Sequence, residues 1–255
     1  MLKQIPNIFT LLNLICGCVA IVYTMQNGIT IQYDAEGAQF IDLSEKIWMA
    51  SLFIAIAAIV DFLDGFVARL FNASSEMGKQ LDSLADLVSF GVAPSMIVYQ
   101  FLRMSYAADQ EGINISIFLL VPAFILAAAG AYRLARYNLN NSQQHGFKGV
   151  PIPAAGLLIA SLPLIYWNST NVTILNLITN KWFLYLLIIF VSWLMVSRLP
   201  LIDLKFKNLS LKSNLSKYIL VIFSVLAAAV FHWLAVPIIF IAYIILSLAF
   251  KNKTA

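Results

Sequence analysis

Charged residues are scarce in this 255-residue chain. Asp, Glu, Lys and Arg make up 11% of it, whereas hydrophobic residues make up 61%. Soluble domains carry about a quarter charged residues, so this chain could not cover a globular surface of its size with polar groups. The apolar residues also come in long runs, which predicts a protein that has a lipid bilayer as its solvent.

Cysteine is equally scarce, with two residues in the whole chain. Cys16 and Cys18 lie in the first apolar run, about 200° apart around a helix, so they cannot act as a pair on one face. No small-residue cleavage site ends this run, and we expect residues 6–23 to be a retained span rather than a signal peptide. No internal repeat or second domain is visible, so we expect residues 1–255 to form a single membrane domain.

Apolar segments of spanning length recur along the chain. They cover residues 7–24, 47–71, 83–103, 114–137, 150–167, 175–197, 215–231 and 233–250. A helix needs about 20 apolar residues to cross the hydrocarbon core of a bilayer. The predicted fold class is therefore all-α, a polytopic membrane helix bundle with about eight transmembrane helices. We expect an outer loop at residues 26–43 and a C-terminal helix hairpin at residues 205–255.

Basic residues fall almost entirely on one side of this arrangement. If the N-terminus lies in the cytoplasm, all of the 16 Lys and Arg residues except Lys46, Arg103 and Lys181 fall on the cytoplasmic side. Cytoplasmic loops carry an excess of Lys and Arg. An even number of spans also keeps both termini together, so we expect both to face the cytoplasm.

Four aspartates stand out, because ionisable residues at membrane depth are costly and usually functional. Asp61 and Asp64 are three residues apart, and Asp82 and Asp86 are four apart, so each pair lies on one face of its helix. The connection at about residues 72–78 is short enough for the two pairs to face each other. Four such carboxylates would repel strongly, and a divalent cation relieves this better than protonation. Hard oxygen ligands select Mg²⁺, Mn²⁺ or Ca²⁺, and the cluster lacks the His and Cys typical of zinc sites.

The residues around the aspartates indicate a phosphate ligand. Gly65 and Gly78 leave room for a bulky group near the backbone, and Arg69 could balance charge or bind a phosphate. Buried salt bridges are a poor alternative, since Arg69 would neutralise only one acid. A proton relay or ion path in a transporter also uses intramembrane acids. Here the acids stop near one end of two helices, which disfavours a path through the membrane.

Residues 61–86, DFLDGFVARLFNASSEMGKQLDSLAD, resemble the signature of the CDP-alcohol phosphotransferase family, D-x2-D-G-x2-A-R-x8-G-x3-D-x3-D. Every fixed position of the signature is present. These positions are Asp61, Asp64, Gly65, Ala68, Arg69, Gly78, Asp82 and Asp86. Other pieces resemble the bacterial, membrane-embedded branch that uses serine as acceptor, namely PNIFTLLNLICG at 6–17, DSLADLVSFGVAPS at 82–95, YRLARYN at 132–138 and FKGVPIPAA at 147–155.

The resemblance implies roles for particular residues. Asp61, Asp64 and Asp82 would bind the metal that holds the CDP diphosphate, and Asp61, Asp82 and Asp86 would bind a second metal. Asp86 would also be the general base, and residues 47–104 would be the helix pair that carries this site. The residues implied to line the CDP site are Asn13, Gly65, Ala68, Arg69 and Gly78.

The acceptor pocket is predicted less directly. Arg133, Arg136 and Lys148 cluster at the cytoplasmic end of the fourth span and could bind the acceptor or a phosphate. The alternative is ordinary anchoring by positive residues on the inner side. Ser89, one turn beyond Asp86, could face the same cavity or bond its own backbone.

The resemblance implies an enzyme that moves a phosphatidyl group from CDP-diacylglycerol to the hydroxyl of L-serine and releases CMP. It would use two divalent cations, Mg²⁺ or Mn²⁺, and act as a homodimer in the bacterial inner membrane. The residues alone leave other acceptors open, such as glycerol 3-phosphate, inositol phosphate or choline. A cation transporter is the alternative from a different class.

Overall fold

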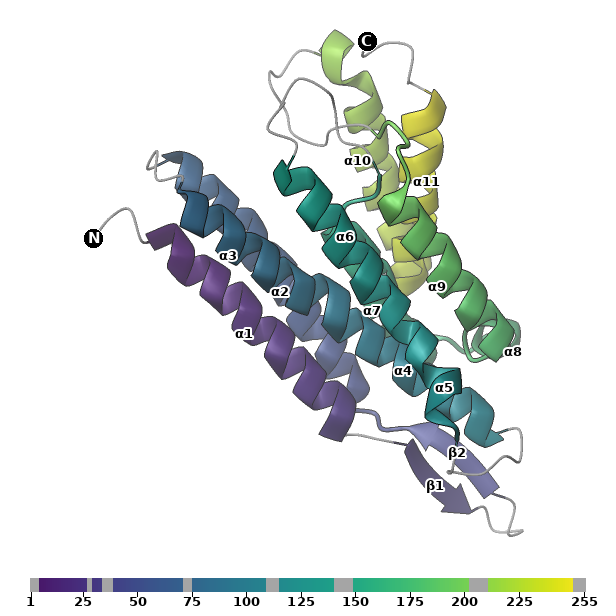
Figure 1. Ribbon diagram of the computed structural model, residues 1–255. Coiled ribbons are helices and arrows are strands. Elements are labelled where there is room, and N and C mark those ends of the chain that lie inside the picture. Colours follow the sequence, from purple (N-terminus) through teal and green to yellow (C-terminus); the bar gives the residue numbers. More distant parts are fainter. Residues whose placement is uncertain are drawn as a thin grey trace.

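The computed structural model describes residues 5–26, 29–33, 39–70, 75–108, 115–139, 149–201 and 211–249. These residues form a bundle of long helices that run along a common direction, with one small pair of strands at one end (Figure 1). The predicted all-α membrane bundle is confirmed.

The first half of the bundle carries the aspartates. Its helices are α1 (Ile5–Gln26), α2 (Ile47–Leu70), α3 (Glu76–Asp86), the π-helix η2 (Leu87–Val92) and α4 (Ala93–Tyr106). The last three elements form one continuous helical segment, Glu76–Tyr106. Its first turn begins at Ser75, whose side-chain oxygen accepts a hydrogen bond from the Gly78 amide. The helix therefore starts inside the connection predicted at residues 72–78, and residues 72–74 of that connection lie outside the described residues.

The second half of the bundle is more interrupted. Its elements are α5 (Ile117–Leu120), η4 (Val121–Phe124), α6 (Ile125–Leu139), α7 (Ile152–Asn168), α8 (Val172–Ile178), α9 (Lys181–Val196), α10 (Leu211–Phe231), η5 (His232–Leu234) and α11 (Ala235–Ala249). α8 and α9 are bent by 63° relative to each other. α10 and α11 lie side by side on one flank of the bundle (Figure 1).

Length and composition identify fewer spans than the eight predicted. Among the described residues, five helices are long and apolar enough to cross a membrane, or six if the bent pair α8 and α9 counts as one span. α7 has 17 residues and is shorter than a usual span. The number eight therefore stays a prediction, although helical segments occur at all eight predicted positions.

The predicted outer loop at residues 26–43 contains two strands. β1 (Ile29–Tyr33) and β2 (Gln39–Leu43) pair antiparallel, with Ile29 opposite Leu43 and Tyr33 opposite Gln39. Strand pairing satisfies backbone groups that a helix cannot serve in such a short segment. Leu43 is buried and joins this pair of strands to the core.

Close packing around α1 and α7 positions the site. α1 lies along α2, α3 and η2. A Cβ atom at Gly17 would meet the Cα of Ser89 at 2.7 Å, so glycine is required for α1 to approach η2. α7 is buried along most of its length and contacts α2, α4 and η2, and a helix apolar on all sides is expected at the centre of a bundle.

Basic side chains that the sequence predicts on opposite sides of the membrane lie at opposite ends of the bundle. At one end, the Lys181 ammonium lies 4.7 Å from the ring centroid of Tyr106. At the other end, Lys79 donates to the Asn138 carbonyl and Arg136 donates to carbonyls at the end of α9. The end that carries Lys79 and Arg136, called the basic end below, is also the end at which α3 begins (Figure 1).

Candidate metal centre

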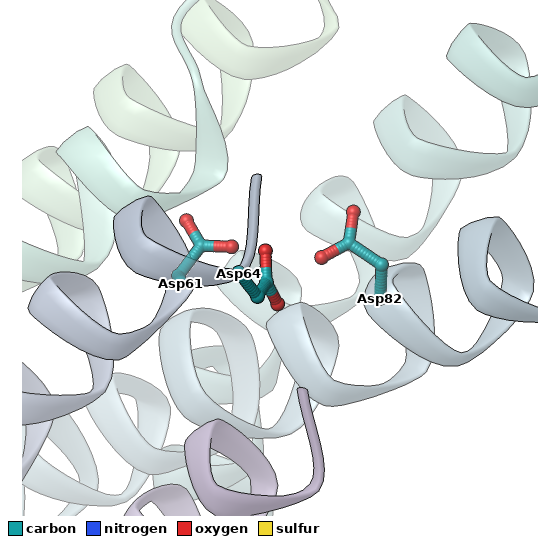
Figure 2. Close-up of side chains that lie close together, drawn as sticks. All are labelled: Asp61, Asp64 and Asp82. Carbon is teal, nitrogen blue, oxygen red and sulfur yellow. The ribbon is translucent and has the colours of Figure 1, made fainter. Parts of the chain in front are cut away.

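Three aspartates from two helices converge near the basic end of the bundle. Asp61 and Asp64 lie on α2 and Asp82 lies on α3, and one carboxylate oxygen from each lies within 4.8 Å of the others. Figure 2 shows the Asp82 carboxylate pointing toward the other two across the space between the helices. The predicted facing of the two pairs therefore holds for three of the four residues.

The donor set suits a hard divalent cation. All three groups offer carboxylate oxygens at a mutual spacing that one ion can bridge. Without a cation, three carboxylates at such distances would repel one another in a medium that screens charge poorly. The group contains no His or Cys, so its composition matches Mg²⁺ or Mn²⁺ better than zinc.

α1 supplies a hydrogen bond to this group that the sequence analysis missed. The Thr10 hydroxyl lies 3.0 Å from Asp64 Oδ2, and both residues are buried. Thr10 belongs to the piece at 6–17 and lies on the same helix face as Asn13 and Gly17, at spacings of three and seven residues. That spacing was the signal available in the sequence, and it became meaningful once α1 was known to pack on α2 and α3.

Asp86 lies outside the group of three but within its electrostatic range. The Asp86 carboxylate is close enough to those of Asp61, Asp82 and Asp64 for electrostatic repulsion. Asp86 itself is buried, with 8% of its surface exposed. Asn13 Nδ2 donates to Asp86 Oδ1 at 3.2 Å. Directly after Asp86 the helix widens into η2, and π-helical turns of this kind frequently occur at functional sites.

Ser89 has a packing role that neither sequence interpretation anticipated. It is fully buried, and its hydroxyl donates to the Asn13 carbonyl at 2.8 Å. The bond joins η2 to α1 at the point where Gly17 allows close approach. Ser89 therefore neither bonds its own helix nor lines an open cavity, because the α1 backbone occupies that side.

The glycines predicted to flank a ligand differ from each other. A Cβ atom built on Gly65 would meet nothing within 4 Å, so the space beside Asp64 is open. A Cβ atom on Gly78 would lie 3.1 Å from both the Asn7 and the Ser75 side chains, so Gly78 is packed against α1 and its own cap. The side chains of Ala68 and Arg69 lie outside the described residues.

Two of the three basic residues predicted near an acceptor, Arg133 and Arg136, are described, and their surroundings differ. Arg133 is 7% exposed, its Nε has no hydrogen-bond partner among the described residues, and its guanidinium interacts electrostatically with Asp86. Arg136 instead donates to the carbonyls of Val196 at 2.8 Å and Ser197 at 3.2 Å, where it caps the end of α9. Lys148 lies outside the described residues.

Comparison with known proteins agrees with this geometry. The family described as CDP-alcohol phosphatidyltransferase matches residues 3–196. A protein named CDP-diacylglycerol–serine O-phosphatidyltransferase from Helicobacter pylori is 34% identical over 219 residues, which cover 85% of this chain and 78% of the relative. A protein of the same name from Bacillus subtilis is 35% identical over 165 residues, covering 65% of this chain and 78% of the relative. Another of that name, from Methanocaldococcus jannaschii, is 41% identical over 106 residues, covering 42% and 46%. This chain belongs to the CDP-alcohol phosphatidyltransferase family.

Proposed function

We propose that this membrane protein transfers the phosphatidyl group of CDP-diacylglycerol to the hydroxyl of L-serine, forming phosphatidylserine and releasing CMP. The observation that carries the proposal is the convergence of Asp61, Asp64 and Asp82 beside the buried Asp86 in a member of this family. The names of the relatives support serine as the acceptor.

Two divalent cations would be held by overlapping sets of these aspartates. Asp61, Asp64 and Asp82 would bind the first, and Asp61, Asp82 and Asp86 would bind the second. Bound there, Mg²⁺ or Mn²⁺ would neutralise the diphosphate and stabilise the charge that develops on the attacking and leaving oxygens. The Thr10 hydroxyl would hold the Asp64 carboxylate in position for this task.

Asp86 would act as the general base. It would take the proton of the serine hydroxyl while that oxygen forms a bond to the lipid-side phosphorus. The bond from this phosphorus to the bridging diphosphate oxygen would break, and CMP would leave with the electron pair. The hydrogen bond from Asn13 would orient the Asp86 carboxylate during this transfer.

The nucleotide would lie over the open space beside Gly65. Asn13, Ala68, Arg69 and Gly78 would complete the CDP site. Among these, Asn13 is supported by a buried Oδ1 atom that has no hydrogen-bond partner among the described residues and could accept one from the ligand.

Arg133 would bind the acceptor. Its buried guanidinium lies within electrostatic range of Asp86, so a serine carboxylate held by Arg133 would bring the hydroxyl close to the base. Lys148 would lie in the same pocket, and Arg136 and Ser89 would support it through their contacts with α9 and α1.

The charge asymmetry supports an orientation with the site and both termini at the cytoplasmic face of the bacterial inner membrane. Accessibility of single cysteines near Lys46 and Arg198 to an impermeant thiol reagent in intact cells would test it. We also propose a homodimer, as the family resemblance implies, which the mass of the detergent-solubilised particle would test.

The reaction is tested by CMP release from CDP-diacylglycerol with the purified protein in detergent and Mn²⁺ or Mg²⁺. L-Serine, glycerol 3-phosphate, inositol phosphate and choline are supplied separately. Release with L-serine alone, together with phosphatidylserine as product, supports the proposal. Release with another alcohol would keep the chemistry and reject serine, whereas no metal-dependent release with any alcohol would reject the chemistry and favour a transporter.

A further inference from the structure

A cavity opens at the end of the bundle opposite to the basic end, where α2 begins, α7 ends and η5 joins α10 to α11. Its volume is about 310 Å³, and pockets that bind small ligands commonly have about 300–1,000 Å³. Trp48 lines the cavity and is 13 residues before Asp61 on α2, so the helical rise separates the two by about 20 Å. The cavity is therefore separate from the proposed metal centre.

Three tryptophans from distant parts of the sequence line this cavity. They are Trp48 on α2, Trp167 on α7 and Trp233 on η5, and α7 contacts both α2 and η5. Their exposed fractions are 37%, 37% and 44%, whereas Trp182 and Trp193 on α9 are 70% and 57% exposed. A tryptophan that anchors a helix needs only to reach the headgroup level by itself. Convergence of three of them on one space is more than anchoring requires.

The polar side chains of the cavity can accept hydrogen bonds. Glu45 and Asn168 both line it. Asn168 Nδ2 donates to the Leu164 carbonyl at 2.8 Å, so this amide can offer its Oδ1 atom to a ligand. A carboxylate and an amide oxygen accept hydrogen bonds from an ammonium group, and indole rings attract a cation to their faces. The combination therefore fits a primary ammonium group.

A second cavity, of about 450 Å³, adjoins the first, since Asn168 and Trp233 line both. His232 and Ala228 also line it. The φ angle of His232 is 49°, which is uncommon for a residue other than glycine and is often found at ligand sites. The imidazole of His232 can donate a hydrogen bond to a phosphate oxygen. Together the two cavities offer acceptors for an ammonium group and a donor for a phosphate.

We propose that these two cavities bind the headgroup of a phospholipid that ends in a primary ammonium, as in phosphatidylethanolamine. The ammonium would lie between Glu45 and the three tryptophans, and the phosphate would lie near His232. A lipid fits better than a soluble amine because α10, which lines the second cavity, exposes apolar side chains along which acyl chains can lie, such as Val225, Leu226 and Val230. The proposal does not depend on the proposed reaction and uses none of its residues.

The test is native mass spectrometry of the purified full-length protein in detergent. Phosphatidylethanolamine, phosphatidylcholine and phosphatidylglycerol with the same acyl chains are supplied in equal amounts. The first phosphatidylethanolamine should bind about tenfold more tightly than phosphatidylglycerol, which has no cation for Glu45 to accept from. Phosphatidylcholine should bind about three- to tenfold more weakly than phosphatidylethanolamine, because its quaternary ammonium has no N–H to donate to Glu45 or Asn168.

Two variants identify the site. Glu45→Gln removes the charge and should weaken binding of phosphatidylethanolamine about two- to fivefold, as for an exposed ion pair. Trp233→Leu should have an effect of about the same size, as for loss of a cation–π contact. Trp182→Leu is the matched control, because Trp182 is an exposed tryptophan in the first turn of α9 and is not among the residues that line either cavity. It should leave the binding unchanged.

The wild-type protein alone can overturn the proposal. Equal binding of phosphatidylethanolamine and phosphatidylglycerol would exclude recognition of the cation, and equal binding of phosphatidylcholine would exclude the two hydrogen-bond acceptors. Among the variants, an equal loss in Trp182→Leu and Trp233→Leu would assign the tryptophans to general anchoring in the membrane and reject the site.

Discussion

Asn13 and Asp86, 73 residues apart in the sequence, form a buried hydrogen bond of 3.2 Å between α1 and the end of α3. Asn13 is fully buried and Asp86 nearly so. The amide uses its Nδ2 for the carboxylate and leaves its Oδ1 without a hydrogen-bond partner among the described residues. A single side chain thus fixes one oxygen of the proposed base and presents an acceptor for a ligand donor.

Replacement of Asn13 by Leu should lower the rate of CMP release by about ten- to a hundredfold, because a hydrogen bond to a charged group contributes about 1.5–3 kcal/mol. Steady-state CMP release in detergent measures this effect. Asn168→Leu is the control, since Asn168 is the last residue of α7 and its side chain donates to the Leu164 carbonyl of the same helix. A rate within twofold of wild type in Asn13→Leu would remove Asn13 from the site.

Replacement of Asp82 by Asn should weaken metal binding. It removes one of three converging carboxylates while it keeps the shape of the side chain. We expect the Mn²⁺ concentration for half-maximal CMP release to rise more than about tenfold, as for loss of a charged ligand from an oxygen site. Glu45→Gln removes an acid at the other end of α2 and should leave the Mn²⁺ dependence unchanged. Equal Mn²⁺ dependence in both variants would argue against a metal held by Asp82.

Replacement of Thr10 by Val should also shift the Mn²⁺ dependence, although by less. Valine has nearly the shape of threonine but cannot donate to Asp64, so the carboxylate loses its orienting partner. Residues behind metal ligands commonly change metal affinity by about ten- to a hundredfold. Thr10→Ser keeps the hydroxyl and should restore most of the affinity. If the serine variant is as impaired as the valine variant, the methyl group and not the hydrogen bond matters.

Two glycines of the site should respond oppositely to alanine. A Cβ atom at Gly17 would meet the Ser89 backbone at 2.7 Å, so Gly17→Ala should destabilise the protein by about 1–3 kcal/mol. A Cβ atom at Gly65 meets nothing, so Gly65→Ala should retain the thermal midpoint and raise the KM for CDP-diacylglycerol if the nucleotide lies there. Thermal unfolding and CMP release measure the two effects. Equal thermal midpoints in the two variants would contradict the close approach of α1 and η2.

Substitutions of Arg136 and Arg133 should affect different properties, namely stability for Arg136 and the KM for serine for Arg133. Arg136→Gln removes donors from the end of α9 and should lower the thermal midpoint, because a cation at a helix C-terminus contributes about 0.3–1 kcal/mol. Its KM for serine should stay close to wild type. Arg133→Gln should raise that KM with less effect on unfolding. A raised KM in Arg136→Gln alone would assign the acceptor to Arg136.

The sequence by itself determined the membrane class, the helix positions and the aspartates that meet. Long apolar runs bounded by polar segments define spanning helices because few other structures satisfy the backbone in lipid. The spacing of Asp61 with Asp64, and of Asp82 with Asp86, fixes each pair to one helix face through helical geometry alone. The signature across residues 61–86 was sufficient to indicate the family, which the match over residues 3–196 confirms.

Only the tertiary structure decided what packs on these helices. Thr10 contacts Asp64, Ser89 bonds the backbone of α1, and Arg136 caps α9. Each of these contacts joins segments more than 50 residues apart in the sequence. Such contacts are set by how side chains interlock when helices pack, and periodicity along one helix contains no information about the partner surface.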